Sequence, residues 1–302
     1  MKQRGGTLLG FIIGLVLGLG IALVYTPSIA SVQPWFTTRR GLAGGIASSG
    51  VGAGTLLVPV IITPIGPDGT YHNPGGGYTY SDAAALRGRW REDGRISWEL
   101  SGLIQADPAR STRGMDEPTF AELPDGTVLA VLRGSNHTKP HLPARRWISR
   151  SADGGRTWSA PEPWTYDDGE AFFSPSSCSQ LVPHSSGRLF WIGNISPKNP
   201  DGNRPRYPLV IGEVDVRSGR LLRATVGPVD DRGPEDSEMM SLSNFSARED
   251  RADGAIVINL SRLFQRSKPG ETDWTAHFGR LVALTRYSSV AALHILVLVA
   301  SI

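Results

Sequence analysis

The sequence predicts a mainly β body built of hairpins, lying between two apolar ends of the chain. The 302 residues include 36 Gly and 22 Pro, a higher share than the average protein has, which favours many tight turns. Short apolar runs alternate with turn signals through the middle of the chain, while both ends contain long uncharged stretches. Because 40% of the residues are hydrophobic, the chain has enough apolar surface for a core, which excludes a wholly disordered protein.

The N-terminal end predicts one transmembrane helix or a helical hairpin within a membrane domain of residues 1–64. Thr7–Tyr25 is uncharged, and a helix of that length spans about 28 Å, close to the bilayer core of about 30 Å. A second uncharged run, Gly41–Pro67, has the small-residue spacing of packed membrane helices and predicts a span over Gly41–Ile62. The alternative is a signal peptide or a signal anchor, because Ser28–Ala30 has the small residues of a cleavage site.

The stretch Gly18–Pro59 resembles the fourth and fifth helices of major-facilitator transporters of the monocarboxylate type. It carries Trp35, Phe36, Arg39 and Arg40, followed by the GLA, GIA and GTL segments of that pattern. The resemblance covers about forty residues, and two helices cannot form an alternating-access pathway between repeats. We therefore interpret it as an anchor or a fusion remnant rather than as a transporter.

Basic residues flank the first apolar run on both sides. Lys2 and Arg4 precede it, and Arg39 and Arg40 follow it. Positive charges favour the cytoplasmic side of a membrane, so the two pairs favour opposite orientations. We expect a membrane-anchored chain with its β body outside the cytoplasm.

The middle of the chain, residues 68–282, predicts one β domain. Its apolar runs are separated by turn dipeptides, which is typical of a sandwich, a barrel or a propeller, and they read RISWEL, TVLAVLRG, RRWISRS, RLFWIGN, YPLVIGEV and GAIVINLSRL. Residues 283–302 form an apolar tail, for which a buried strand, an interfacial segment and a segment from a shifted reading frame are all open.

An S-x-D-x-G-x-x-W box from Ser151 to Trp158 predicts a specific hairpin turn. Asp153 is expected to accept hydrogen bonds from backbone N–H groups of the turn. Gly155 permits a positive φ, and Trp158 is expected to pack under the loop. We expect this box to be structural, so Asp153 is not a candidate acid.

With this box, residues 78–278 resemble the sialidases (neuraminidases) and their BNR-repeat relatives, which are six-bladed β-propellers. Three further segments follow the order of that family. They are Asp116–Thr119 with the AELPDGTVLAVLR that follows, Ser174–Asn194 with Cys178 at its Cys-containing position, and the RYPLVI strand that begins at Arg206.

The resemblance implies a site for a sugar carboxylate. It places Glu117 as the partner of the catalytic tyrosine, and Arg133 and Arg206 as the second and third arginines that bind the substrate carboxylate. An arginine guanidinium is planar, permanently charged and able to bind a carboxylate through two hydrogen bonds. Sialidases use a tyrosine nucleophile, which a neighbouring glutamate activates.

Two departures from the family pattern weaken the expectation of catalysis. Leu242 occupies the tyrosine position, and the first blade, with its arginine and its acid Asp, is not recognisable. At about 40–50 residues per blade, the β domain has room for four or five blades. We therefore expect an incomplete propeller of the six-bladed type and very weak hydrolysis of a sialoside.

Three functions remain open. They are a sialidase-family glycoside hydrolase of the exo-α-sialidase type, a non-catalytic membrane-tethered propeller that binds an anionic glycan, and a transporter-related membrane protein with a fused middle. The partners expected are an anionic glycan or sialoside and a membrane. The net charge of +3 gives no reason to expect nucleic acid, and a single Cys with six His at no metal-ligand spacing predicts neither a metal nor a cofactor.

Overall fold

The computed structural model describes residues 55–268, 273, 276–285 and 295–301. The predicted membrane helix over Thr7–Tyr25 lies outside these residues. Within the described part of the chain, no helix is both long and apolar enough to cross a bilayer. The chain divides into two compact units, residues 1–56 with 88–98 and residues 57–87 with 99–302, and the site described below belongs to the second.

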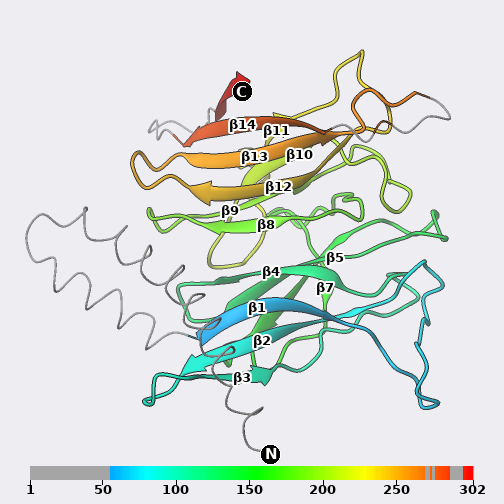
Figure 1. Cartoon of the computed structure of the whole chain (residues 1–302), viewed down its shortest axis with the longest axis vertical. Helices are drawn as coiled ribbons and strands as arrows, with labels where there is room; N and C mark the ends of the chain where they lie inside the picture. The colour runs from blue at the N-terminus through cyan, green and yellow to red at the C-terminus, as the bar shows by residue number, and fades with distance from the viewer. Residues whose placement is uncertain (1–54, 269–272, 274–275, 286–294, 302) are drawn as a thin grey trace, which may run out of the picture. The chain divides into compact units, whose positions relative to one another are not determined.

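The described residues form four sheets, each made of consecutive strands (Figure 1). The first sheet contains β1 (Thr55–Ile62), β2 (Asp82–Trp90) and β3 (Ile96–Leu100). The second contains β4 (Asp116–Glu122), β5 (Val128–Arg133), β6 (Arg146–Ser151) and β7 (Glu162–Pro163). The third contains β8 (Gln180–Pro183), β9 (Leu189–Asn194), β10 (Leu209–Val214) and β11 (Gly227–Asp230), with a 3₁₀ turn over Arg223–Thr225. The fourth contains β12 (Ser241–Glu249), β13 (Ile256–Leu263), β14 (Ala276–Thr285) and β15 (Ile295–Ser301).

The prediction of a mainly β chain made of antiparallel sheets is confirmed. In the last three sheets every strand pairs antiparallel with its neighbour in sequence. Each of the six apolar runs forms a strand, namely β3, β5, β6, β9, β10 and β13. Strands β5, β6, β9 and β10 are almost entirely buried, because they lie inside their sheets and bury both faces, whereas β3 is an edge strand with exposed residues.

Strand β9 shows how the sheets pack. Leu189 and Trp191 enter the core between the second and third sheets, whereas Phe190 and Ile192 enter the core between the third and fourth. Successive side chains of a strand point to opposite faces, so one strand supplies two cores. Trp191 meets Trp164 edge to face, with 5.3 Å between the ring centroids.

The first strands of the last three sheets lie beside one another, with β8 between β4 and β12. Thr119 Oγ1 in β4 accepts a hydrogen bond of 3.1 Å from the Leu181 N–H in β8. The Gln180 side chain makes two hydrogen bonds with the backbone of Ala247 in β12, one at 2.7 Å and one at 2.9 Å. These strands therefore carry the residues that meet in the candidate site.

The prediction of a second membrane helix over Gly41–Ile62 is wrong for its last eight residues. Thr55–Ile62 is strand β1 and belongs to the first sheet. Its β-branched Val and Ile residues favour extended backbone, and Pro59 disfavours the interior of a helix. The part of the prediction over residues 41–54 lies outside the described residues.

The C-terminal tail also contributes to the β body. Ile295–Ser301 forms β15, which pairs antiparallel with β14 over its whole length. Of the conformations considered for this tail, the described residues Ile295–Ser301 adopt a strand.

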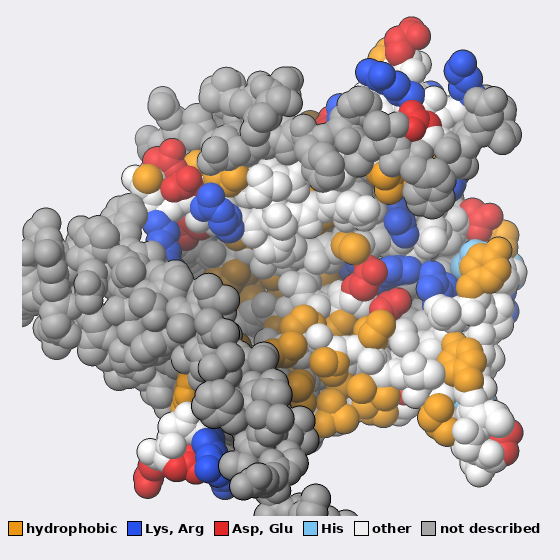
Figure 2. All heavy atoms as spheres, viewed as in Figure 1, with side chains coloured by type: hydrophobic (Ala, Val, Ile, Leu, Met, Phe, Trp, Pro, Cys, Tyr) orange, Lys and Arg blue, Asp and Glu red, His pale blue; other side chains and the backbone are white. Residues whose placement is uncertain are grey.

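Large apolar side chains are unevenly distributed over the described surface. Those that stay exposed lie between residues 56 and 103, among them Ile61, Ile65 and Leu100. Figure 2 shows apolar side chains gathered over the part of this face where β1 and β2 lie.

The predicted S-x-D-x-G-x-x-W turn is confirmed in detail. The Asp153 carboxylate accepts hydrogen bonds from the N–H groups of Arg156 and Thr157, both at 2.9 Å. Hydrogen bonds from Thr157, together with one from Ser151, hold the pKa of Asp153 well below its usual range. Gly155 has φ +79°, and Trp158 stacks on Phe120 at 5.2 Å.

Truncating a core side chain of β9 should destabilise the β body. Ile192 is fully buried, so we expect Ile192→Ala to lower the free energy of unfolding by about 2–5 kcal/mol and Ile192→Val by about 0.5–1.5 kcal/mol. Leu100, which is 50% exposed, is the control, and Leu100→Ala should change the stability by less than about 0.5 kcal/mol. Urea unfolding measures all three, and equal effects of the two Ala variants would contradict the assigned core.

Candidate anion-binding site

Glu117 lies in a bulge of β4 with an uncommon backbone conformation. The pairing of β4 with β5 shifts between Asp116 and Thr119, and Glu117 has φ +42°. Left-handed backbone costs a non-glycine residue about 1–2 kcal/mol, and the following Pro118 further restricts its backbone. Bulges redirect side chains, and such strain gathers at functional sites, so the local geometry marks Glu117 independently of any motif.

Arg133, the last residue of β5, forms an ion pair with Glu117. Its Nη1 lies 2.5 Å from Glu117 Oε1 and 4.0 Å from Asp116 Oδ2. Arg133 is 8% exposed, whereas the Glu117 side chain is 35% exposed. Burial opposes ionisation of Glu117, but the charge and hydrogen bond of Arg133 outweigh it, so the Glu117 pKa lies below its usual value.

Arg206 reaches the same place from the segment before β10. Its Nη2 donates to the Ser176 carbonyl at 2.8 Å, and its Nη1 donates to Ser243 Oγ at 3.2 Å. Burial and the positive charge of Arg133 lower the Arg206 pKa, so the two guanidiniums act on each other. The structure thus brings the three predicted site residues, Glu117, Arg133 and Arg206, into one cluster.

The position predicted for the missing tyrosine does not face this cluster. Leu242 is fully buried in the core between the third and fourth sheets. Its backbone N–H donates to the Arg206 carbonyl at 3.0 Å, while its neighbour Ser243 points its hydroxyl at the Arg206 guanidinium. Because side chains alternate along β12, Ser243 occupies the position nearest the site and Leu242 belongs to the core.

Two further arginines, which the sequence reasoning missed, surround the cluster. Arg146 in β6 pairs across the ladder with Arg133 and is fully buried. It donates to the Ser177 carbonyl at 2.9 Å and to Ser174 Oγ at 3.0 Å, and burial lowers its pKa to about 10. The loop between β5 and β6 is long, so the sequence does not fix the register that places Arg146 opposite Arg133.

Arg113 is the second of these. It precedes β4 by three residues and donates to Thr79 Oγ1 from Nε at 3.2 Å. Burial and the charge of Arg133 lower its pKa, whereas Asp116 and Glu117 act in the opposite direction. The signal in the sequence that could have identified Arg113 is its closeness to the Asp116–Thr119 motif.

Cys178 lies next to Glu117 but lacks the electrostatics of a reactive thiol. Burial and the negative charge of Glu117 raise the pKa of the thiol. A thiol is nucleophilic as the thiolate, so at neutral pH Cys178 is a poor nucleophile. Within the described residues, no group of three or more His, Cys, Asp or Glu is placed to hold a metal ion.

A cavity of about 180 Å³ opens beside Arg206. Its lining combines two guanidiniums with apolar and polar side chains, and consists of Asn203, Arg204, Arg206, Met239, Met240, Ser241 and Phe264. The Arg206 Nε is buried and has no hydrogen-bond partner in the described structure. A buried donor without a partner is costly, so this Nε is a strained point next to the cavity.

Residues 32–220 match the family model of the BNR repeat-like domain. The chain belongs to this family. The match covers Glu117, Arg133 and Arg206, but ends before the fourth sheet, which carries Ser243. The predicted relationship to BNR-repeat proteins is therefore confirmed.

A separate match confirms the resemblance to monocarboxylate-type transporters. The chain is 56% identical over 50 residues to monocarboxylate transporter 12-B of Danio rerio and 52% identical over 50 residues to monocarboxylate transporter 12 of Homo sapiens. Each match covers 16% of this chain and 10% of the transporter. The chain thus spans about a tenth of the length of the curated relatives it matches.

Solved structures with similar folds share little sequence with the chain. A protein of unknown function from Dyadobacter fermentans DSM 18053 has 15% identity and a TM-score of 0.48, over 76% of this chain and 50% of that one. The K499G mutant of NanB sialidase from Streptococcus pneumoniae has 17% identity and a TM-score of 0.41, over 67% of this chain and 26% of that one.

Restoring a tyrosine at position 242 should not create a catalytic centre. Leu242 fills the core, so we expect Leu242→Tyr to destabilise the chain by about 1–3 kcal/mol through overpacking and to leave turnover of an aryl sialoside unchanged. Ser243→Tyr is the matched control, because it places the same ring beside Arg206. Urea unfolding and a fluorogenic assay test both, and turnover gained by Leu242→Tyr would contradict the assignment.

The Glu117–Arg133 pair should make stability depend on acidity. Because the folded-state pKa of Glu117 is lowered, its stabilising contribution is present above the unfolded-state pKa and is lost as the pH falls through the folded-state pKa. From pH 6 to pH 3, the urea midpoint of Glu117→Gln should decrease less than the midpoint of the unaltered chain. An identical loss in both proteins would show that the pair contributes nothing to the acid response.

Proposed function

We propose that the chain binds the carboxylate of an acidic sugar, as a sialidase-like member of the BNR-repeat family. The observation that carries the proposal is the cluster of Arg133 and Arg206 around Glu117, beside a cavity that Arg206 lines. Guanidiniums in a partly desolvated site bind a carboxylate through charge-assisted hydrogen bonds, which are about twice as strong as neutral ones.

Each residue has a distinct role in this proposal. Arg133 and Arg206 hold the carboxylate, and Arg146 keeps the Ser174–Ser177 segment in place beneath them. Glu117, held by Arg133, stays ionised and accepts a hydrogen bond from a sugar hydroxyl. This arrangement recognises an acid and a neighbouring hydroxyl together, as an acidic sugar presents them.

The residues of the site support binding of a glycan better than they support its hydrolysis. The sialidase route requires a nucleophile that forms a covalent glycosyl intermediate. Leu242 lies in the core, and the pKa of Cys178 is raised. We therefore propose binding of a sialoside or another anionic glycan, with exo-α-sialidase turnover very weak.

The wider organisation also belongs to the proposal. We propose that the four sheets are blades of an incomplete propeller of the sialidase type, and that the residues before β1 tether it to a membrane with the β body on the extracytoplasmic side. The match to monocarboxylate transporter 12 supports membrane association, over 50 residues only. The two sheet-to-sheet connections made by Thr119 and Gln180 support the stacking of blades.

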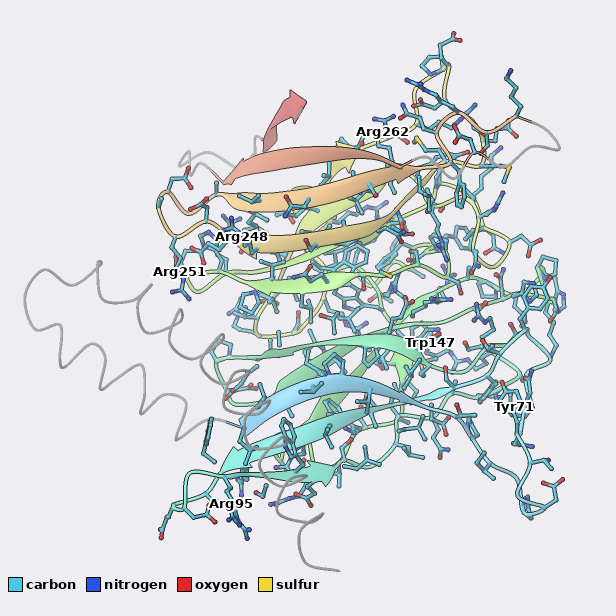
Figure 3. All side chains as sticks on the ribbon, viewed as in Figure 1. Tyr71, Arg95, Trp147, Arg248, Arg251 and Arg262 are labelled. Atoms are coloured by element: carbon cyan, nitrogen blue, oxygen red, sulfur yellow. The ribbon has the colours of Figure 1, made fainter. Side chains whose placement is uncertain are left out.

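Calorimetric binding of free N-acetylneuraminic acid to the full-length chain tests the site. We expect Arg206→Gln and Arg133→Gln each to weaken binding about 10-fold or more, since a hydrogen bond to a charged group contributes about 1.5–3 kcal/mol. Arg251→Gln removes the same charge from the exposed β12–β13 turn and should leave binding unchanged. Figure 3 shows Arg251 at that hairpin, with Arg262 toward the opposite end of the strands.

The same protein is assayed for turnover of a fluorogenic sialoside. Weak turnover with measurable binding is the expected result. Robust turnover that survives Glu117→Gln would place the catalytic centre elsewhere, and loss of both binding and turnover in the unaltered chain would contradict the proposed function.

A further inference from the structure

Arginines outnumber carboxylates around the candidate site. The guanidiniums of Arg113, Arg133, Arg146, Arg204 and Arg206 are linked to one another by their electrostatic effects, and the two carboxylates among them are Asp116 and Glu117. Five guanidiniums and two carboxylates leave the cluster with excess positive charge. A ligand with one carboxylate leaves most of this excess unpaired.

Part of the excess positive charge lies on Arg204, at the wall of the cavity. It lines the 180 Å³ cavity together with Arg206, and its charge lowers the pKa of Arg206. The Arg204 side chain is exposed and makes no ion pair with any described residue. An exposed guanidinium on a cavity wall is free to meet an anionic group that enters from solvent.

Phe264 forms the apolar side of the same cavity, together with Met239 and Met240. Its φ of +59° lies in the left-handed region, which is uncommon for a bulky residue. Residues held in such conformations gather at ligand-binding positions. An aromatic ring beside two guanidiniums suits a ligand with an apolar ring face and an anionic substituent, which is the surface of an acidic sugar residue.

We propose that the cavity between Arg204 and Phe264 is a second anion subsite, and that the ligand is an acidic oligosaccharide with negative groups on neighbouring residues. One carboxylate binds at Arg133 and Arg206, and the next acidic residue enters the cavity, where Arg204 meets its anionic group and Phe264 contacts its ring. The inference rests on the proposed function and narrows it from acidic sugars in general to those with consecutive charges.

Calorimetry on the full-length chain compares N-acetylneuraminic acid, which has one carboxylate, with its α2,8-linked dimer, which has two. We expect the dimer to bind at least about 10-fold more tightly, because it makes a second charge-assisted contact. Arg204→Gln should remove this advantage while leaving the monomer affinity within about twofold. Phe264→Ala should weaken the dimer selectively, and Arg251→Gln, about 25 Å or more from Ser241 along β12, should alter neither.

The outcomes separate the two proposals. Equal affinities for monomer and dimer would overturn the second subsite and leave the proposed function standing, whereas binding of neither would overturn the proposed function itself. A similar loss for both ligands in Arg204→Gln would place Arg204 in the first site and overturn the inference. Inorganic tripolyphosphate is the third probe, and binding as tight as that of the dimer would show general attraction of polyanions and would also overturn it.

Discussion

The burial of Arg133 and Arg146, with Arg206 half-buried beside them, is the constraint on which the rest of the site depends. Burying an unpaired charge is costly, so each guanidinium needs oxygen atoms at fixed positions. Glu117 supplies a carboxylate to Arg133, and the segment from Ser174 to Ser177 supplies carbonyl and hydroxyl groups to the other two. Loss of any one partner leaves a buried donor unsatisfied, which couples the site to the stability of the whole β body.

The sheets provide these positions because their first strands lie next to one another. Glu117 is in β4, Ser243 is in β12, and the segment before β8 carries Ser174–Ser177 between them. Tight cores on both sides of the third sheet fix the spacing, since close-packed interiors resist shifts of even a methylene group. The bulge at Glu117 then redirects one side chain out of the regular ladder and toward Arg133.

The family match and the fourth sheet cover different parts of the chain. The BNR repeat-like match covers the strands from β1 to β10 and includes the three predicted site residues. It does not reach the fourth sheet, where Leu242 lies in the core and Ser243 faces Arg206. Met239, Met240 and Phe264, which lie next to the strands of this sheet in sequence, line the cavity together with Arg204 and Arg206.

Local sequence determined the hairpins and the Ser151–Trp158 turn, because turn residues and two-residue periodicity act over short distances along the chain. The resemblance to a family, and not periodicity, identified Glu117, Arg133 and Arg206. Tertiary structure alone decided three other matters. Thr55–Ile62 is a strand because a partner in the first sheet was available, although its uncharged composition suits a membrane helix equally well. Leu242 faces the core and Ser243 faces Arg206 because of the strand register. Arg113 and Arg146 join Arg133 because the fold brings together residues far apart in sequence.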